Sequence, residues 1–137
     1  MATDRLQRAD IPAATRTLAA AFADYPLIRA VAPANRGRAA AAFCGMLVRS
    51  TVADGTAYAT ADRTAAACWH APGRAPLTPW GLVRAGVLPL AWELGLCGGV
   101  LLERLGRQFE RHRLVHVPGP HWYLLLLGVA PAARGRG

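Results

Sequence analysis

Apolar residues recur at helical spacing in the first part of the chain, which predicts two helices there. In residues 11–23 they repeat every three or four positions and define one apolar face. Asp10 is expected to be the N-cap of this helix. Pro26 is expected to end it, because the residue before a proline avoids the helical region. A second helix is expected from about Asn35 to Val52. The predicted inner-face residues are Ile11, Ala14, Leu18 and Phe22 in the first helix, and Ala39, Phe43, Met46 and Leu47 in the second.

Short stretches of alternating or small residues predict strands around these helices. Residues 5–8 alternate in polarity and predict a short edge strand. Residues 56–60 and 64–69 flank a short connection at 61–63, which is typical of a β-hairpin. The segment after residue 69 contains Pro72 and Gly73 and is expected to lead away from the sheet.

Residues 77–115 have a helical character that is interrupted. Pro89 and the pair Gly98-Gly99 are expected to divide the stretch into two or three helical pieces. In the last piece Leu101, Leu105 and Phe109 predict one apolar face. Glu103 can pair with Arg107 on another face, so the arginines of residues 104–113 are interpreted as a solvated helix surface.

The last part of the chain contains an unbroken apolar run from Tyr123 to Val129. Such a run predicts a strand that is buried on both faces, and hence a central strand. Gly128 within it indicates either a bulge or the close approach of another backbone or a ligand. Pro131 ends the strand. The four residues Arg134, Gly135, Arg136 and Gly137 then offer backbone amides and two cations, which suit a diphosphate.

Composition indicates one domain over residues 1–137, with enough apolar residues (53%) to form a core. The formal net charge is +8, and every one of the 16 basic residues is Arg. Most of these arginines are scattered along the chain, whereas a nucleic-acid-binding surface requires a concentrated basic patch. The charge pattern therefore argues against nucleic-acid binding.

Cys44, Cys68 and Cys97 stand far apart, which argues against a disulfide framework and favours a reducing, cytoplasmic compartment. Early charged residues exclude a secretory signal. The apolar stretch from Leu77 to Leu102 is interrupted by Arg84 and Glu93, so we expect no membrane span.

Two groups of residues were considered for catalysis or metal binding. His112 and His116 are four positions apart, but no nearby side chain completes a zinc site, so no metal is expected. Cys68 and His70 are two positions apart on a strand. No third residue is available to orient the histidine, so Cys68 is interpreted as a buried core residue.

The segment from His121 onward resembles the acetyl-CoA motif of the GCN5-related N-acetyltransferases. That motif is a strand ending near Val-x-Pro, followed by Gln/Arg-x-x-Gly-x-Gly/Ala and a helix. Arg134 matches its first position and Gly137 its first glycine. The predicted order of elements is also similar to that family. The resemblance implies an α+β (α/β) fold: a mixed, mostly antiparallel sheet flanked by helices, incomplete at its C-terminus.

The resemblance also implies acetyl transfer from acetyl-CoA directly to an amine, carried by a small molecule or a peptide. The backbone of Leu127, Gly128 and Val129 would bind the pantetheine arm and polarise the thioester. The amides of Arg134, Gly135, Arg136 and Gly137 would bind the pyrophosphate. A general base is not identified; His70 and His121 stay open for that role.

The family motif continues beyond Gly137. The chain is therefore expected to hold only the N-terminal portion of such a domain, and to bind acetyl-CoA weakly or not at all by itself. A non-catalytic remnant that acts as a folding or dimerisation partner is the alternative interpretation. An Arg-rich nucleic-acid-binding domain is a weaker one. A homodimer stays open.

Overall fold

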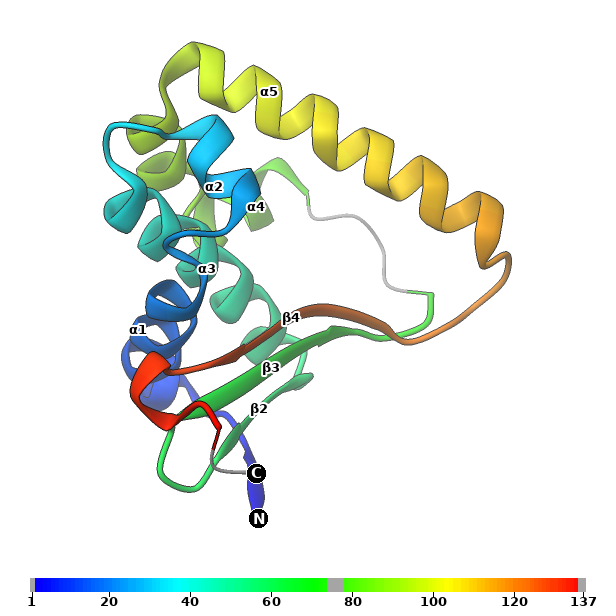
Figure 1. Ribbon diagram of the computed structural model, residues 1–137. Coiled ribbons are helices and arrows are strands. Elements are labelled where there is room, and N and C mark those ends of the chain that lie inside the picture. The colour runs from blue at the N-terminus through cyan, green and yellow to red at the C-terminus, as the bar shows by residue number, and fades with distance from the viewer. Residues whose placement is uncertain (1, 74–77, 136–137) are drawn as a thin grey trace.

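The protein is an α+β domain, described by a computed structural model for residues 2–73 and 78–135 (Figure 1). In these residues four strands form one antiparallel sheet in chain order, β1-β2-β3-β4. The strands are β1 (Thr3–Arg5), β2 (Ala57–Thr60), β3 (Ala65–His70) and β4 (Tyr123–Val129). The helices are α1 (Ile11–Phe22), α2 (Pro26–Val31), α3 (Arg36–Ala53), α4 (Pro79–Ala85) and α5 (Val87–His116), with short 3-10 helices η1 (Arg8–Asp10) and η2 (Pro131–Ala133). The predicted fold class is confirmed.

The main core lies between one face of the sheet and helices α1 and α3. Burial alternates along β2 and β3, because successive strand residues point to opposite faces. Leu18 of α1, Cys44 of α3 and Cys68 of β3 are fully buried there. The predicted apolar face of α1 is confirmed, as Ile11 and Phe22 pack against the same cluster. On α3, Ala39 is buried and the other predicted residues are partly buried.

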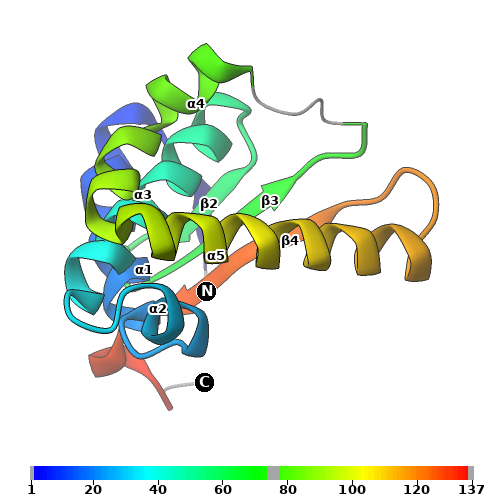
Figure 2. The same cartoon turned by 90° about the horizontal axis from the view of Figure 1, so that it is seen from above.

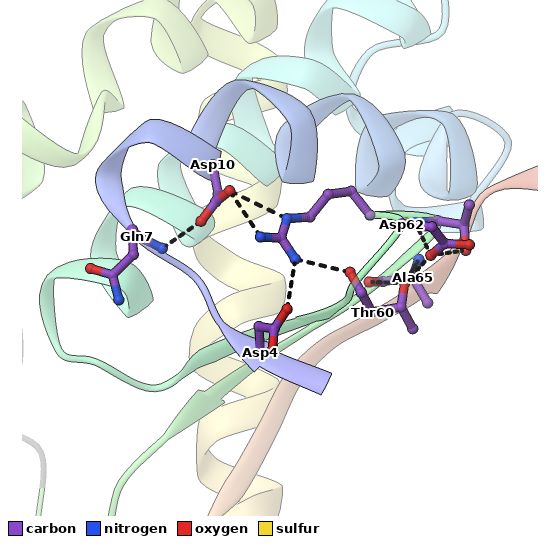
Figure 3. Close-up of polar contacts among 8 residues, drawn as sticks. Asp4, Gln7, Asp10, Thr60, Asp62 and Ala65 are labelled. Carbon is purple, nitrogen blue, oxygen red and sulfur yellow. Dashed lines mark hydrogen bonds and ion pairs between the residues drawn. The ribbon is translucent and has the colours of Figure 1, made fainter. Parts of the chain in front are cut away.

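The N-terminal elements differ from two predictions. The edge strand covers Thr3–Arg5 and not residues 5–8. Asp10 makes no side-chain cap for α1; its carboxylate accepts a hydrogen bond from the Gln7 amide (2.8 Å) instead. That carboxylate also pairs with Arg63, whose guanidinium lies 3.2 Å from Asp10 and 3.5 Å from Asp4 (Figure 3). Arg63 thus ties β1 and η1 to the β2–β3 turn.

The helical region after residue 78 is divided at other positions than predicted. Gly86 adopts φ 100° and separates α4 from α5, and Gly95 (φ 61°) interrupts α5. Pro89 lies within the first turn of α5, where its missing N–H has no helical partner to lose. Gly98 and Gly99 stay helical. A Cβ at Gly98 would lie 2.3 Å from the Val31 carbonyl oxygen, so this glycine allows α2 to pack directly on α5.

Helix α5 packs on α2 and α3, and its C-terminal half continues past them as an arm (Figure 1, Figure 2). Its packed residues include Leu94 and Leu102, which contact a second cluster formed with Ile28 and Ala39. In the predicted apolar face Leu102 takes the place of Leu101, which is 38% exposed, whereas Leu105 is partly buried as predicted. The predicted Glu103–Arg107 pair is present at 2.7 Å.

β4 has the predicted bounds, but it is not a central strand within the described residues. It pairs with β3 alone, and its burial alternates at Leu126 and Gly128, so it is not buried on both faces. The pairing contains a register shift: Cys68 faces Leu126, whereas Trp69 faces Leu124. Leu125 is the extra residue, so the bulge lies there and not at Gly128.

Candidate functional site

The outer edge of β4 presents backbone hydrogen-bonding groups that no described strand uses. The Ala130 amide donates to the Thr64 carbonyl (2.7 Å) on the β3 side. Because these groups alternate along an antiparallel ladder, those of Gly128 face β3 as well. The N–H and C=O groups of Leu127 and Val129 consequently face away from β3. Leu127 therefore offers both of its backbone groups to a ligand. Val129 offers its N–H, since its carbonyl accepts a hydrogen bond from Arg134 Nε (3.4 Å).

Gly128 allows α1 to pack closely against β4. A Cβ at this position would lie 2.9 Å from Leu18 Cδ2 and 3.0 Å from Ala21 Cβ. Of the two interpretations of this glycine, close approach is the correct one, and the approaching element is α1. Gly128 therefore keeps one predicted role in a ligand site, as the residue that links Leu127 and Val129.

A turn follows directly after β4. Pro131 begins η2, as expected of the residue that ends the strand, and Gly135 adopts φ 75°, a conformation that favours glycine. Arg134 donates through Nε to the Val129 carbonyl and through Nη2 to the Ala21 carbonyl, at 3.4 Å each. Arg134 and Gly135 therefore lie next to the free edge of β4. The predicted residues Arg136 and Gly137 lie outside the described residues.

A cavity of about 1090 Å³ opens at the bulged end of β4. Its wall comes from α1, α3, the C-terminal half of α5 and the bulge, and most of the lining is apolar or aromatic. Polar groups gather at one end of it, on α5, β3 and the segment before β4. These polar residues are His70, Glu110, Arg113, His121 and Tyr123.

Glu110 and Arg113 form a two-point ion pair at this polar end. Arg113 Nε donates to Glu110 Oε2 (2.8 Å), and its Nη2 donates to the other carboxylate oxygen. These hydrogen bonds hold the pKa of Glu110 below its usual range and raise that of Arg113. Arg113 also lies over the ring of Tyr123, 5.4 Å from the ring centroid. Glu110 is therefore an ionised carboxylate with little basicity.

The hydrogen bonds of His121 determine its tautomer. Its Nδ1 lies 2.8 Å from the Gly119 carbonyl oxygen, which can only accept, so Nδ1 carries the proton. Its Nε2 lies 2.7 Å from Arg113 Nη1, which can only donate, so Nε2 is the acceptor. The ring is thus neutral and its lone pair is occupied. His121 positions Arg113 and does not have a free lone pair for a substrate proton.

His70 lies at the end of β3, opposite Tyr123, with the two ring centroids 6.4 Å apart. It lines the cavity close to the bulge. The thiol two residues before it is enclosed in the core, and burial raises the pKa of Cys68. The interpretation of Cys68 as a core residue and not a nucleophile therefore agrees with its surroundings.

Sequence reasoning did not find the Glu110–Arg113–His121 cluster. Arg113 was included in a solvated helix surface and Glu110 was not singled out, because the contact of Arg113 with residues after the helix depends on how α5 is placed. The three-residue spacing of an acid and a base was the available sign.

His112 and His116 share one helix face, with stacked rings whose centroids are 6.2 Å apart.

No model of a known protein family matches this chain. In the described residues, no three metal-binding side chains come together. No single described helix has the length and hydropathy of a membrane span; only α4 and α5 taken together reach it, and they are bent by 98°.

Proposed function

We propose that this chain carries the acetyl-CoA-binding half of an N-acetyltransferase site, which transfers an acetyl group directly to an amine. The observation that carries the proposal is the free edge of β4 between the turn at Arg134 and Gly135 and the cavity at Leu125. An extended pantetheine arm can pair with Leu127 and Val129 as an additional strand would. Its pyrophosphate would then lie at the turn, and its thioester at the cavity.

The chemistry requires few protein groups. The amine nitrogen forms the new C–N bond, the C–S bond breaks with its electrons on sulfur, and the amine proton is passed to the thiolate. His70 is the best candidate to accept that proton first. His70 lines the cavity beside the bulge, and Glu110 is held ionised by Arg113 with little basicity.

Nucleic-acid binding is less favoured than acetyl transfer, although part of α5 is rich in arginine. Arg107 pairs with Glu103 and Arg113 pairs with Glu110, so half of the four-arginine group is neutralised on the same helix. The net charge of this surface is accordingly lower than its arginine content implies.

A titration followed by amide chemical shifts tests the proposal, with acetyl-CoA, acetyl-pantetheine and ADP added separately up to millimolar concentration. We expect acetyl-pantetheine to shift Leu127 and Val129, and ADP to shift Arg134 and Gly135. Acetyl-CoA should shift both sets. Ligands that leave both sets unchanged would overturn the proposal.

Two substitutions at one position sharpen this test. Leu127→Pro removes the outward N–H but no bond to β3, and proline is tolerated where an edge-strand N–H faces outward. We expect it to weaken acetyl-pantetheine binding about 3- to 10-fold, the contribution of one hydrogen bond. Leu127→Ala keeps the N–H and should bind as the native chain does.

A further inference from the structure

We propose that the cavity at the bulge takes a lipophilic primary amine, one with an aromatic or branched aliphatic body, as the acceptor. This inference rests on the proposed acetyl transfer and specifies its second substrate. The cavity volume of about 1090 Å³ lies just above the ~300–1,000 Å³ that is usual for small-molecule sites, so a ligand of many carbon atoms fits.

The lining of the cavity selects for apolar surface. Aromatic and aliphatic side chains from α1, α3, α5 and the residue before α2 form much of the wall: Phe22, Tyr25, Phe43, Leu47, Leu105 and Phe109. The rings of Phe22 and Tyr25 meet edge to face, with their centroids 5.3 Å apart. An aromatic ligand could pack against this pair in the same geometry. Phe109 is 57% exposed, so a ligand in the cavity would cover it.

The charges at the cavity select against polycations. Its two formally charged lining residues in the described chain, Glu110 and Arg113, neutralise each other. A second or third ammonium group entering the cavity would lose hydration without gaining a carboxylate of its own. Polyamines and basic peptides are therefore poor acceptors. A single amine can lie at the polar end, where His70 and the half-exposed Glu110 are close to the bulge.

Binding of two probes to the whole chain tests this selectivity. In a chemical-shift titration, 4-phenylbutylamine should shift the amides of Leu105, Gly106 and Tyr123, whereas spermidine should not. Phe109→Ser should weaken 4-phenylbutylamine binding more than about fivefold. The neighbouring change Gln108→Ser is the control and should leave the binding unchanged.

Equal shifts with spermidine, or none with 4-phenylbutylamine, would overturn this inference. The acetyl-pantetheine titration of Leu127 and Val129 uses other residues and another ligand. An amine that fails to bind while acetyl-pantetheine still binds would reject the acceptor class and leave the acetyl-CoA site standing.

Discussion

Two neighbouring glycines of α5, Gly98 and Gly99, have opposite surroundings. A Cβ at Gly98 would lie 2.3 Å from the Val31 carbonyl oxygen, whereas a Cβ at Gly99 would meet no atom within 4 Å. The sequence contains nothing that distinguishes them, because the difference arises from α2, more than sixty positions earlier in the chain. Contact with a distant backbone is what sequence spacing cannot reveal.

We expect opposite effects from the same substitution at these two positions. Gly98→Ala should lower the free energy of unfolding by ~1–3 kcal/mol, since the added methyl group must push α2 and α5 apart. Gly99→Ala should raise it by ~0.5–1 kcal/mol, because alanine favours the helix. Urea unfolding of both variants measures the two effects. Equal changes in both would contradict the close α2–α5 contact.

Cys44 makes stability dependent on alkaline pH. Burial, and to a smaller extent the nearby Cys68, raises the pKa of Cys44 to about 12 from an ordinary 9.0. The unfolded chain therefore loses this proton first as pH rises above 9. The unfolding free energy should fall by up to ~1.4 kcal/mol per pH unit from this group.

Urea unfolding under reducing conditions at pH 8 and pH 10.5 checks this expectation. Cys44→Ala should reduce the pH dependence, although its stability at pH 8 should be lower because a side-chain volume is lost. A slope that the substitution leaves unchanged would assign the alkaline loss to other groups.

At the scale of the elements, local patterns predicted the existence of most helices and strands but not how they join. The apolar face of α1, the β2–β3 hairpin and the bounds of β4 follow from spacing and turn residues. The short helix α2 was missed, because six residues are too few to show a period. The α4–α5 break was placed at Pro89 because proline usually interrupts helices, whereas here Gly86 provides the turn and Pro89 falls in a first turn.

The candidate site divides in the same way. The strand and the turn after it at Arg134 and Gly135 were predicted from the apolar run and its ending. The free edge was not predicted, because a central strand was expected, and the ligand role of Leu127 and Val129 came from the family resemblance and stays a prediction. The cavity was not predicted, and neither were the later contacts of its ion pair, since Arg113 meets His121 and Tyr123 only when the chain after α5 returns to the sheet as β4. Contacts of that kind depend on tertiary placement.

The Arg63 network joins three elements and should make stability sensitive to acid. The hydrogen bond from the Gln7 amide, and next Arg63, hold the pKa of the Asp10 carboxyl below its ordinary 3.8. A lowered pKa stabilises the fold above that ordinary value, and this contribution is lost as pH falls below it. Asp10→Asn should therefore flatten the loss of stability between pH 5 and pH 2.5.

Thermal unfolding followed by circular dichroism over that pH range measures the effect. Asp24→Asn is the control, because Asp24 is 87% exposed and bonds only Arg36 among the described contacts. If both variants lose stability in acid as the native chain does, the network of Figure 3 does not contribute to the acid response.

At the scale of the whole molecule, stability is unevenly distributed. The sheet, α1 and α3 contain the fully buried residues, whereas α5 beyond Leu102 is mostly exposed and touches the rest through Leu105 and the Arg113 cluster (Figure 2). A helix with so little burial opens at low free energy. The part of the cavity wall that α5 forms is therefore the part that is most easily displaced.

Hydrogen exchange should detect this difference. We expect amides in residues 103–116 to exchange much faster than those of α3, and to become protected when 4-phenylbutylamine binds. Protection of the two helices to the same degree in the free chain would show that the arm is part of the cooperative core.

The extra residue at Leu125 changes which face of β4 the residues before it occupy. In a straight strand, alternate side chains point to the same face. One inserted residue therefore moves every residue before it to the opposite face. Tyr123 thereby turns toward His70 and Arg113, while Leu126 and Gly128 stay in the core. Deleting Leu125 would make the ladder regular, with Leu124 still opposite Trp69 and Tyr123 still opposite His70. We therefore expect the bulge to disappear while Tyr123 keeps its place at the cavity.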